Sequence, residues 1–187
     1  TTGDSQIIMA NKHGRAIRFH ESTVREMGRT ATGVRGMTLD ETGDDEVIGM
    51  ICIKDPEKET VMVVSEQGYG KRSEIEDYRI TNRGGKGVKT LNITEKTGNL
   101  VAIKSVTDEN DLVIINKSGI TLRMKVADVR IMGRATQGVR LINLEKRNDE
   151  IASVCKVLSE TESDSSNSEN IDSASEINEA EASETTE

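Results

Sequence analysis

The chain has 187 residues, with 25 basic and 33 acidic side chains, a formal net charge of −8 and 2% aromatic residues. Taken whole, this composition argues against a nucleic-acid binder, and one Phe and two Tyr are too few for a surface that stacks the bases of single strands. No stretch approaches the roughly 18 apolar residues of a membrane helix, so we expect no membrane partner and a cytoplasmic location.

Short runs rich in Val and Ile, separated by polar breaks, predict β-strands along most of the chain. In chain order, the predicted strands are Gln6–Ala10, Ala16–Phe19, Val34–Leu39, Val47–Ile53, Thr60–Ser65, Lys71–Ser73, Val88–Ile93, Leu100–Val106, Leu112–Asn116, Thr121–Met124, Val139–Leu144 and Glu150–Val157. Four strands per roughly 50 residues are typical of the blades of a propeller, which predicts an all-β fold.

The strands belong to an internal repeat of three copies. Gly14, Gly68 and Gly119 each precede a second glycine by 19 residues, and the copies start 54 and 51 residues apart. Such a period indicates a propeller, solenoid or array. We therefore expect blades at residues 1–54, 55–107 and 108–157. Because three blades are few for a closed propeller, we expect part of a longer domain with an unpaired sheet edge.

Basic residues recur in register with the glycines, which places positive charge periodically on the surface. The candidate DNA-binding residues are Arg18, Arg25, Arg29, Arg35, Arg72, Arg79, Arg83, Lys86, Lys89, Arg123, Arg130, Arg134 and Arg140. Arg18, Arg72 and Arg123 lie within predicted strands and could equally pair with an acid on a neighbouring strand. Arg29, Arg83 and Arg134 lie in Gly-rich loops, where charge has little structural use, so they are favoured as DNA contacts.

Residues 158–187 contain ten acids and no base, and without them the remaining chain carries 25 bases and 23 acids. This composition predicts a disordered acidic tail. It either keeps the protein soluble or acts as a mobile polyanion that competes with DNA for the basic surface. We expect no catalytic residues, cofactor or metal site. Cys52 and Cys155 are isolated, and His13 and His20 have no partners at metal-ligand spacing.

Three stretches, Ala16–Gly36, Gly68–Arg72 and Ile131–Arg140, resemble successive blades of the C-terminal domain family of the DNA gyrase A protein. The resemblance covers about residues 3–157. It implies the last three four-stranded blades of a six-bladed β-pinwheel, in which neighbouring blades exchange strands and duplex DNA wraps around a basic outer rim. Arg83–Gly87 also resembles the gyrase-A box, although Thr81 and Asn82 stand where the box has Gln and Arg.

The same resemblance implies a parent protein that is an ATP-hydrolysing type IIA topoisomerase, with ATP and Mg in the complex. It implies a partnership with the gyrase B protein in an A2B2 complex, through an N-terminal region that this chain lacks. Two other classes stay open: the C-terminal domain of the topoisomerase IV A protein, and a non-catalytic protein-interaction propeller. An independent enzyme is rejected, because no nucleophile, base or metal constellation is apparent.

Overall fold

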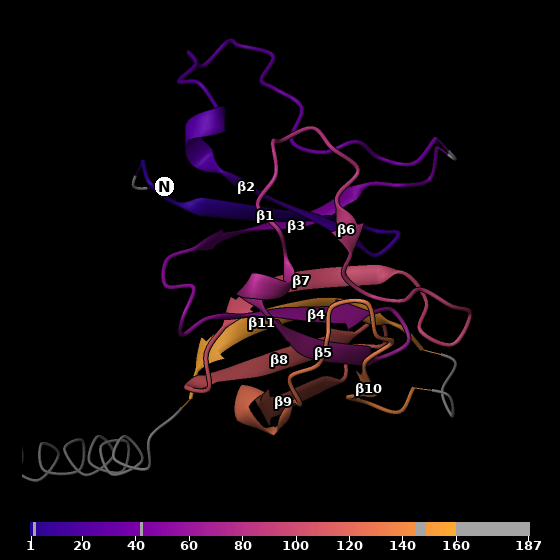
Figure 1. Cartoon of the computed structure of the whole chain (residues 1–187). Helices are drawn as coiled ribbons and strands as arrows, with labels where there is room; N and C mark the ends of the chain where they lie inside the picture. Colours follow the sequence, from indigo (N-terminus) through magenta and orange to yellow (C-terminus); the bar gives the residue numbers. More distant parts are fainter. Residues whose placement is uncertain (2, 42, 145–148, 160–187) are drawn as a thin grey trace, which may run out of the picture.

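The computed structural model describes residues 1, 3–41, 43–144 and 149–159 (Figure 1). The predicted tail from residue 160 onward lies outside the described residues. Three antiparallel sheets make up the fold, which confirms the all-β prediction. No helix in the described ranges is long and apolar enough to cross a membrane.

Each sheet is built from three strands of its own copy, and two sheets gain a fourth strand from the next copy. Sheet one has the order β3 (Val47–Ile53), β1 (Gln6–Asn11), β2 (Arg15–His20), β6 (Val88–Lys89). Sheet two has the order β7 (Leu100–Val106), β4 (Thr60–Ser65), β5 (Tyr69–Glu74), β10 (Val139–Arg140). Sheet three contains β11 (Ile151–Leu158), β8 (Asn110–Asn116) and β9 (Thr121–Lys125). The strand exchange implied by the resemblance is therefore confirmed.

The third predicted strand of each copy is where the structure differs most from the prediction. In copies two and three it shortens to the two-residue strands β6 and β10. Val34–Leu39 forms no strand, because the described residues contain no earlier sheet with an edge for it to pair with; instead Thr38 N donates to Gly85 O at 2.9 Å. For the same reason sheet three has three strands and not the predicted four, since the described residues contain no further copy that could supply β9 with a partner.

Two smaller features were not predicted. A single 3₁₀ turn follows the second strand of each copy, at Glu21–Thr23, Ile75–Asp77 and Val126–Asp128. At the other end of the chain, β11 runs one residue past the predicted tail boundary, and Ser159 N donates to Glu109 O at 3.0 Å. Leu158 and Ser159 thus belong to the third blade and not to the tail.

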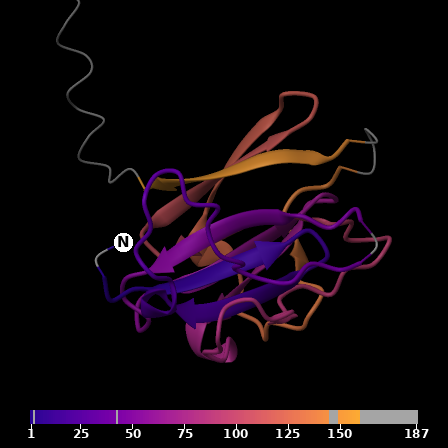
Figure 2. The ribbon, with the colours of Figure 1, turned by 90° about the horizontal axis from the view of Figure 1, so that it is seen from above.

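The core lies between the sheets. All six residues of β4 are buried. Because successive side chains of a strand point to opposite faces, β4 packs against a neighbouring sheet on each face. Val61 and Val63 join the cluster between sheets one and two, whereas Met62 and Val64 join the cluster between sheets two and three. Seen from above, sheet three extends past sheet one, so the stack is offset (Figure 2).

The sheets have an inner and an outer edge. β3 contacts β7, and β7 contacts β11, so these three strands form the inner edge of the stack. The exchanged strands β6 and β10 lie at the opposite end of their sheets, which we call the outer edge.

Glycine is required where an exchanged strand meets the preceding sheet. A Cβ at Gly87 would lie 2.4 Å from Ala16 O, and one at Gly138 would lie 2.6 Å from Gly70 O. Both glycines have positive φ, as does their counterpart Gly33, where an added Cβ would meet nothing within 4 Å in the described residues. The close approach therefore exists only where a preceding sheet exists.

We predict that Gly87→Ala destabilises the protein far more than Gly33→Ala. Left-handed backbone strain of about 1 kcal/mol is common to both substitutions. Contact with the backbone of β2 adds at least about 2 kcal/mol at Gly87 alone. Denaturant unfolding of the two variants measures the difference, and equal losses of stability would contradict a close-packed seam at this glycine.

Candidate nucleic-acid interface

Three basic segments run along the outer side of the molecule. We call residues 25–35, 79–89 and 130–140 the rim segments; each follows a 3₁₀ turn. The second lies along the edge of β2, with a bridge between Arg18 and Ile80 and the β2–β6 pairing at Ala16 and Val88. The third lies along β5 in the same way.

Charge within the rim segments is strongly one-sided. Residues 79–89 contain four cations and no carboxylate, and residues 130–140 contain three cations and no carboxylate. Residues 25–35 contain three cations and one acid, Glu26. A chain with an overall charge of −8 thus concentrates positive charge on its outer edge.

Several predicted site residues are exposed on this edge. Arg25, Arg79 and Arg130 occupy equivalent positions, and their side chains have no hydrogen-bond or ion-pair partner among the described residues. The side chains of Arg29, Arg35 and Lys86 are likewise exposed. Two further cations are exposed but tethered to a neighbour.

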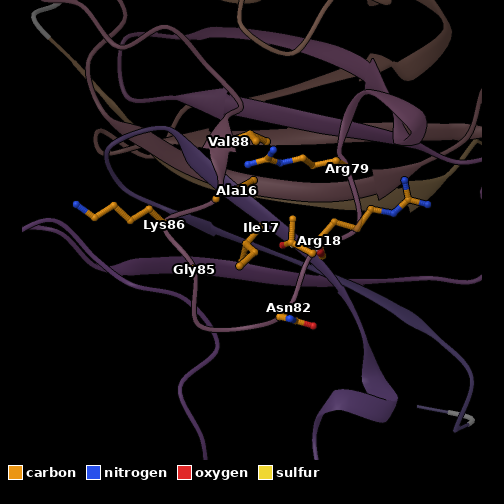
Figure 3. Close-up of a pocket in the computed structure, with 10 residues that line it drawn as sticks. Ala16, Ile17, Arg18, Arg79, Asn82, Gly85, Lys86 and Val88 are labelled. Atoms are coloured by element: carbon orange, nitrogen blue, oxygen red, sulfur yellow. Dashed lines mark hydrogen bonds between the residues drawn. The ribbon is translucent and has the colours of Figure 1, made fainter.

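Those tethers are short. Lys89 Nζ donates to Asn92 Oδ1 at 3.2 Å, and Arg140 Nη2 donates to Tyr69 Oη at 3.0 Å. A cavity of about 270 Å³ lies in the seam between β2 and the second rim segment. Figure 3 shows Arg79 lying across this seam beside Val88, and Lys86 extending away from it.

Arg18 and Arg72 do not face solvent, so the prediction that they contact DNA is wrong. They are only 4% and 6% exposed. Arg18 Nη1 donates to Ile75 O at 2.7 Å and to Tyr78 O at 3.0 Å, both in the 3₁₀ turn region of copy two. Burial lowers the pKa of Arg18.

Arg72 repeats this contact one copy later. Its Nε donates to Val129 O at 2.8 Å, and its Nη1 pairs with Asp108. The third member of the series, Arg123, meets no following turn in the described residues and is exposed; it donates to Asp111 Oδ2 at 2.8 Å within its own sheet. Arg18 and Arg72 therefore join neighbouring blades.

Arg83 and Arg134 also bridge copies, in the opposite direction. Arg83 Nε donates to Thr23 O at 3.0 Å and its Nη1 to Arg35 O at 3.1 Å. Arg134 Nε donates to Asp77 O at 3.0 Å and its Nη1 to Lys89 O at 2.8 Å. The premise that charge in these loops has little structural use is wrong, whereas their contact with DNA stays a prediction.

A buried lysine was missed by the sequence analysis. Lys71 is fully buried, at a position that Ile17 and Leu122 occupy in the other copies. Its Nζ donates to Gly133 O at 2.6 Å and also to Arg134 O, so it anchors the third rim segment. Burial lowers the pKa of Lys71 to about 8, against an opposing effect of Asp77. The sequence offered one signal for it: a lysine stands where the other two copies have an apolar residue.

The structure also gathers carboxylates around a histidine for which no partners were expected. His13 Nδ1 lies 3.1 Å from Asp40 Oδ2, and its Nε2 lies 3.4 Å from Asp44 Oδ1. The hydrogen bond to Asp40, followed by the charges of Asp45 and Asp44, raises the pKa of His13. This hydrogen-bonded cluster joins the β1–β2 hairpin to the loop that precedes β3.

Comparison with known proteins agrees with this geometry. The family model described as DNA gyrase C-terminal domain, beta-propeller, matches residues 5–54, 59–107 and 110–155. The DNA gyrase A protein of Staphylococcus aureus (strain NCTC 8325 / PS 47) is 47% identical over 169 residues, which are 90% of this chain and 19% of that protein. The same protein from strain MRSA252 is 51% identical over 144 residues, covering 77% of this chain and 16% of its own length.

Solved structures show the same architecture. A DNA gyrase A C-terminal domain superposes with a TM-score of 0.75 at 29% identity, covering 83% of this chain and 51% of that one. A topoisomerase IV C-terminal domain gives a TM-score of 0.78 at 24% identity, covering 84% and 48%, which shows a shared fold. The chain spans about a fifth of the length of the curated relatives it matches. It belongs to the DNA gyrase C-terminal domain family.

The blade-joining arginines should be worth more to stability than their exposed counterpart. Arg18→Ala or Arg72→Ala removes a buried donor and leaves carbonyls of the next blade unpaired, at an expected cost of about 2–4 kcal/mol. Arg123→Ala should cost less, about 1 kcal/mol, because the Arg123 side chain is exposed and its buried partner Asp111 keeps a hydrogen bond from Ser159 Oγ. Urea unfolding of the three variants tests this, and a cost at Arg123 as large as at Arg18 would refute a blade-joining role.

Lys71 should make stability rise with pH. The folded chain releases the proton near pH 8, whereas the unfolded chain holds it up to the usual 10.5. Between these values the unfolded state binds more protons, so stability increases with pH. Relative to Lys71→Leu, the native chain should gain about 2 kcal/mol between about pH 7 and about pH 9.5. Chemical denaturation of both proteins across this range provides the measurement; a constant difference would contradict the lowered pKa.

Proposed function

We propose that the rim segments bind double-stranded DNA without choice of sequence and bend it around the outer edge. The observation that carries this proposal is the pair of rim segments, residues 79–89 and 130–140, which hold seven cations and no carboxylate along successive blades. Duplex DNA is a dense line of phosphates, and contacts from Lys and Arg gain affinity by releasing counterions. Contacts distributed over several blades offset the free-energy cost of bending the duplex.

The environment of the aromatic side chains supports a duplex over a single strand. Phe19, Tyr69 and Tyr78 are 3%, 7% and 0% exposed. Base stacking requires exposed aromatic rings, and all three rings are buried. This surface is therefore suited to contacts between its cations and the phosphate backbone of DNA.

We further propose that the chain is part of a longer protein, a DNA gyrase A protein like those named in the comparisons. The two Staphylococcus aureus DNA gyrase A proteins are 47% and 51% identical to it, and the gyrase A structure is 29% identical against 24% for the topoisomerase IV structure, so the gyrase assignment is favoured. In this proposal the parent supercoils DNA in the cytoplasm, with ATP, Mg and a gyrase B partner, and this chain holds the wrapped duplex. The choice between a solubilising and a competing role for the acidic tail stays a prediction.

Removing two rim cations should weaken binding and flatten its salt dependence. Arg79→Ala/Arg130→Ala removes two exposed side chains that bind nothing else in the described structure. The slope of log affinity against log salt should fall by about 1.8, with affinity lower on the order of tenfold, for any duplex sequence. Fluorescence anisotropy over a salt series measures both quantities.

A charge-matched control lies on the inner edge. Lys104→Ala/Lys156→Ala removes two cations from β7 and β11 and should leave the affinity and the slope near those of the native chain. If the inner and outer variants lose affinity equally, net charge and not the rim accounts for binding.

A further inference from the structure

Arg83 and Arg134 form the same two-point contact with the preceding copy. In each case Nε binds a carbonyl that ends a 3₁₀ turn, that of Thr23 or Asp77. In each case Nη1 binds the carbonyl of a cation at the far end of a rim segment, that of Arg35 or Lys89. The acceptors are equivalent positions in copies one and two, so the contact is a repeated feature of the fold.

The two carbonyls bracket a rim segment that has little regular structure of its own. Residues 79–87 form no strand or helix. Exposed Arg79 follows the first acceptor, Asp77, by two residues, and exposed Lys89 provides the second acceptor itself. One guanidinium group therefore fixes both ends of the segment, and with them the spacing between two cations that face solvent.

Each of these arginines is itself part of the next rim segment. Arg83 links residues 25–35 to residues 79–89, and Arg134 links residues 79–89 to residues 130–140. Lys71 holds the backbone of the third segment at Gly133 and Arg134. The three segments are thus joined into one hydrogen-bonded band along the outer edge.

We propose that Arg83 and Arg134 are positioning residues for duplex bending: they set the relative placement of the rim cations, and so the path of the DNA, through the carbonyls of the preceding copy. This inference rests on the proposed function. Lysine is not equivalent at these positions, because a planar guanidinium holds Nε and Nη1 in a fixed fork with each nitrogen aimed at its own carbonyl, whereas an ammonium group carries all its donors on one freely rotating nitrogen.

The test uses the full chain with Arg83→Lys/Arg134→Lys, which keeps both charges. Affinity and salt slope for a duplex should stay within about twofold of the native values, since the number of cations is unchanged. Energy transfer between dyes at the two duplex ends should fall toward that of free DNA, because the bend is no longer held. The matched control, Lys104→Arg/Lys156→Arg, exchanges two cations on the inner edge, outside the rim segments, and should leave both measurements unchanged. Native bending in the Arg83→Lys/Arg134→Lys protein would overturn the proposal.

A measurement without DNA separates this inference from the proposed function. In the free protein, Arg134→Lys alone should speed hydrogen exchange roughly tenfold at the amides of residues 79–89, and Arg83→Lys alone at those of residues 25–35. The change must appear in the preceding copy and not in the copy that carries the substitution. Unaltered exchange there would refute the positioning role. If hydrogen exchange changes as expected but neither the native chain nor the variants bind duplex DNA, the proposed function fails. The hydrogen-bonded band then exists but does not bend DNA.

Discussion

The contact between one copy's rim segment and the outer edge of the preceding sheet is the interaction on which the rest of the structure depends. A sheet edge presents unpaired N–H and C=O groups that must be covered. Here β6 and β10 pair with that edge, and Thr81 N and Met132 N donate to the carbonyls of Arg18 and Arg72 at 2.8 Å. The copies therefore fold as an interlocked series and not as separate beads.

Reciprocal arginines secure this contact from both sides. A guanidinium from each of the first two sheets reaches forward to the 3₁₀ turn of the next copy, and a guanidinium from the next copy reaches back to the preceding turn. Carbonyl oxygens are the acceptors throughout the backward contacts. Because a cation bonded to carbonyls keeps its charge, this joint adds positive potential at the same edge that carries the exposed cations.

The same residue type thus has three environments within one repeat. Arg18 is buried, Arg83 is half-buried and bonded at two points, and Arg79 is exposed without a partner among the described residues. Only the last kind offers its full hydrogen-bonding capacity to a phosphate. A basic repeat therefore contains fewer free cations than its sequence suggests, and the number of phosphate contacts follows the exposed group.

The sequence by itself determined the local structure. Runs of β-branched residues located nearly every strand, with Val47–Ile53, Thr60–Ser65 and Leu100–Val106 found at their predicted bounds, and the period of the glycines located the copies. The tertiary structure alone decided which sheet receives β6, why Val34–Leu39 stays without a ladder, and which arginines are buried. Arg18 and its acceptor Ile75 are 57 residues apart, about one repeat. The sequence of one copy determines the spacing of its own side chains. It does not show which edge of the neighbouring copy lies beside them, and the carbonyl groups of that edge are the hydrogen-bond acceptors.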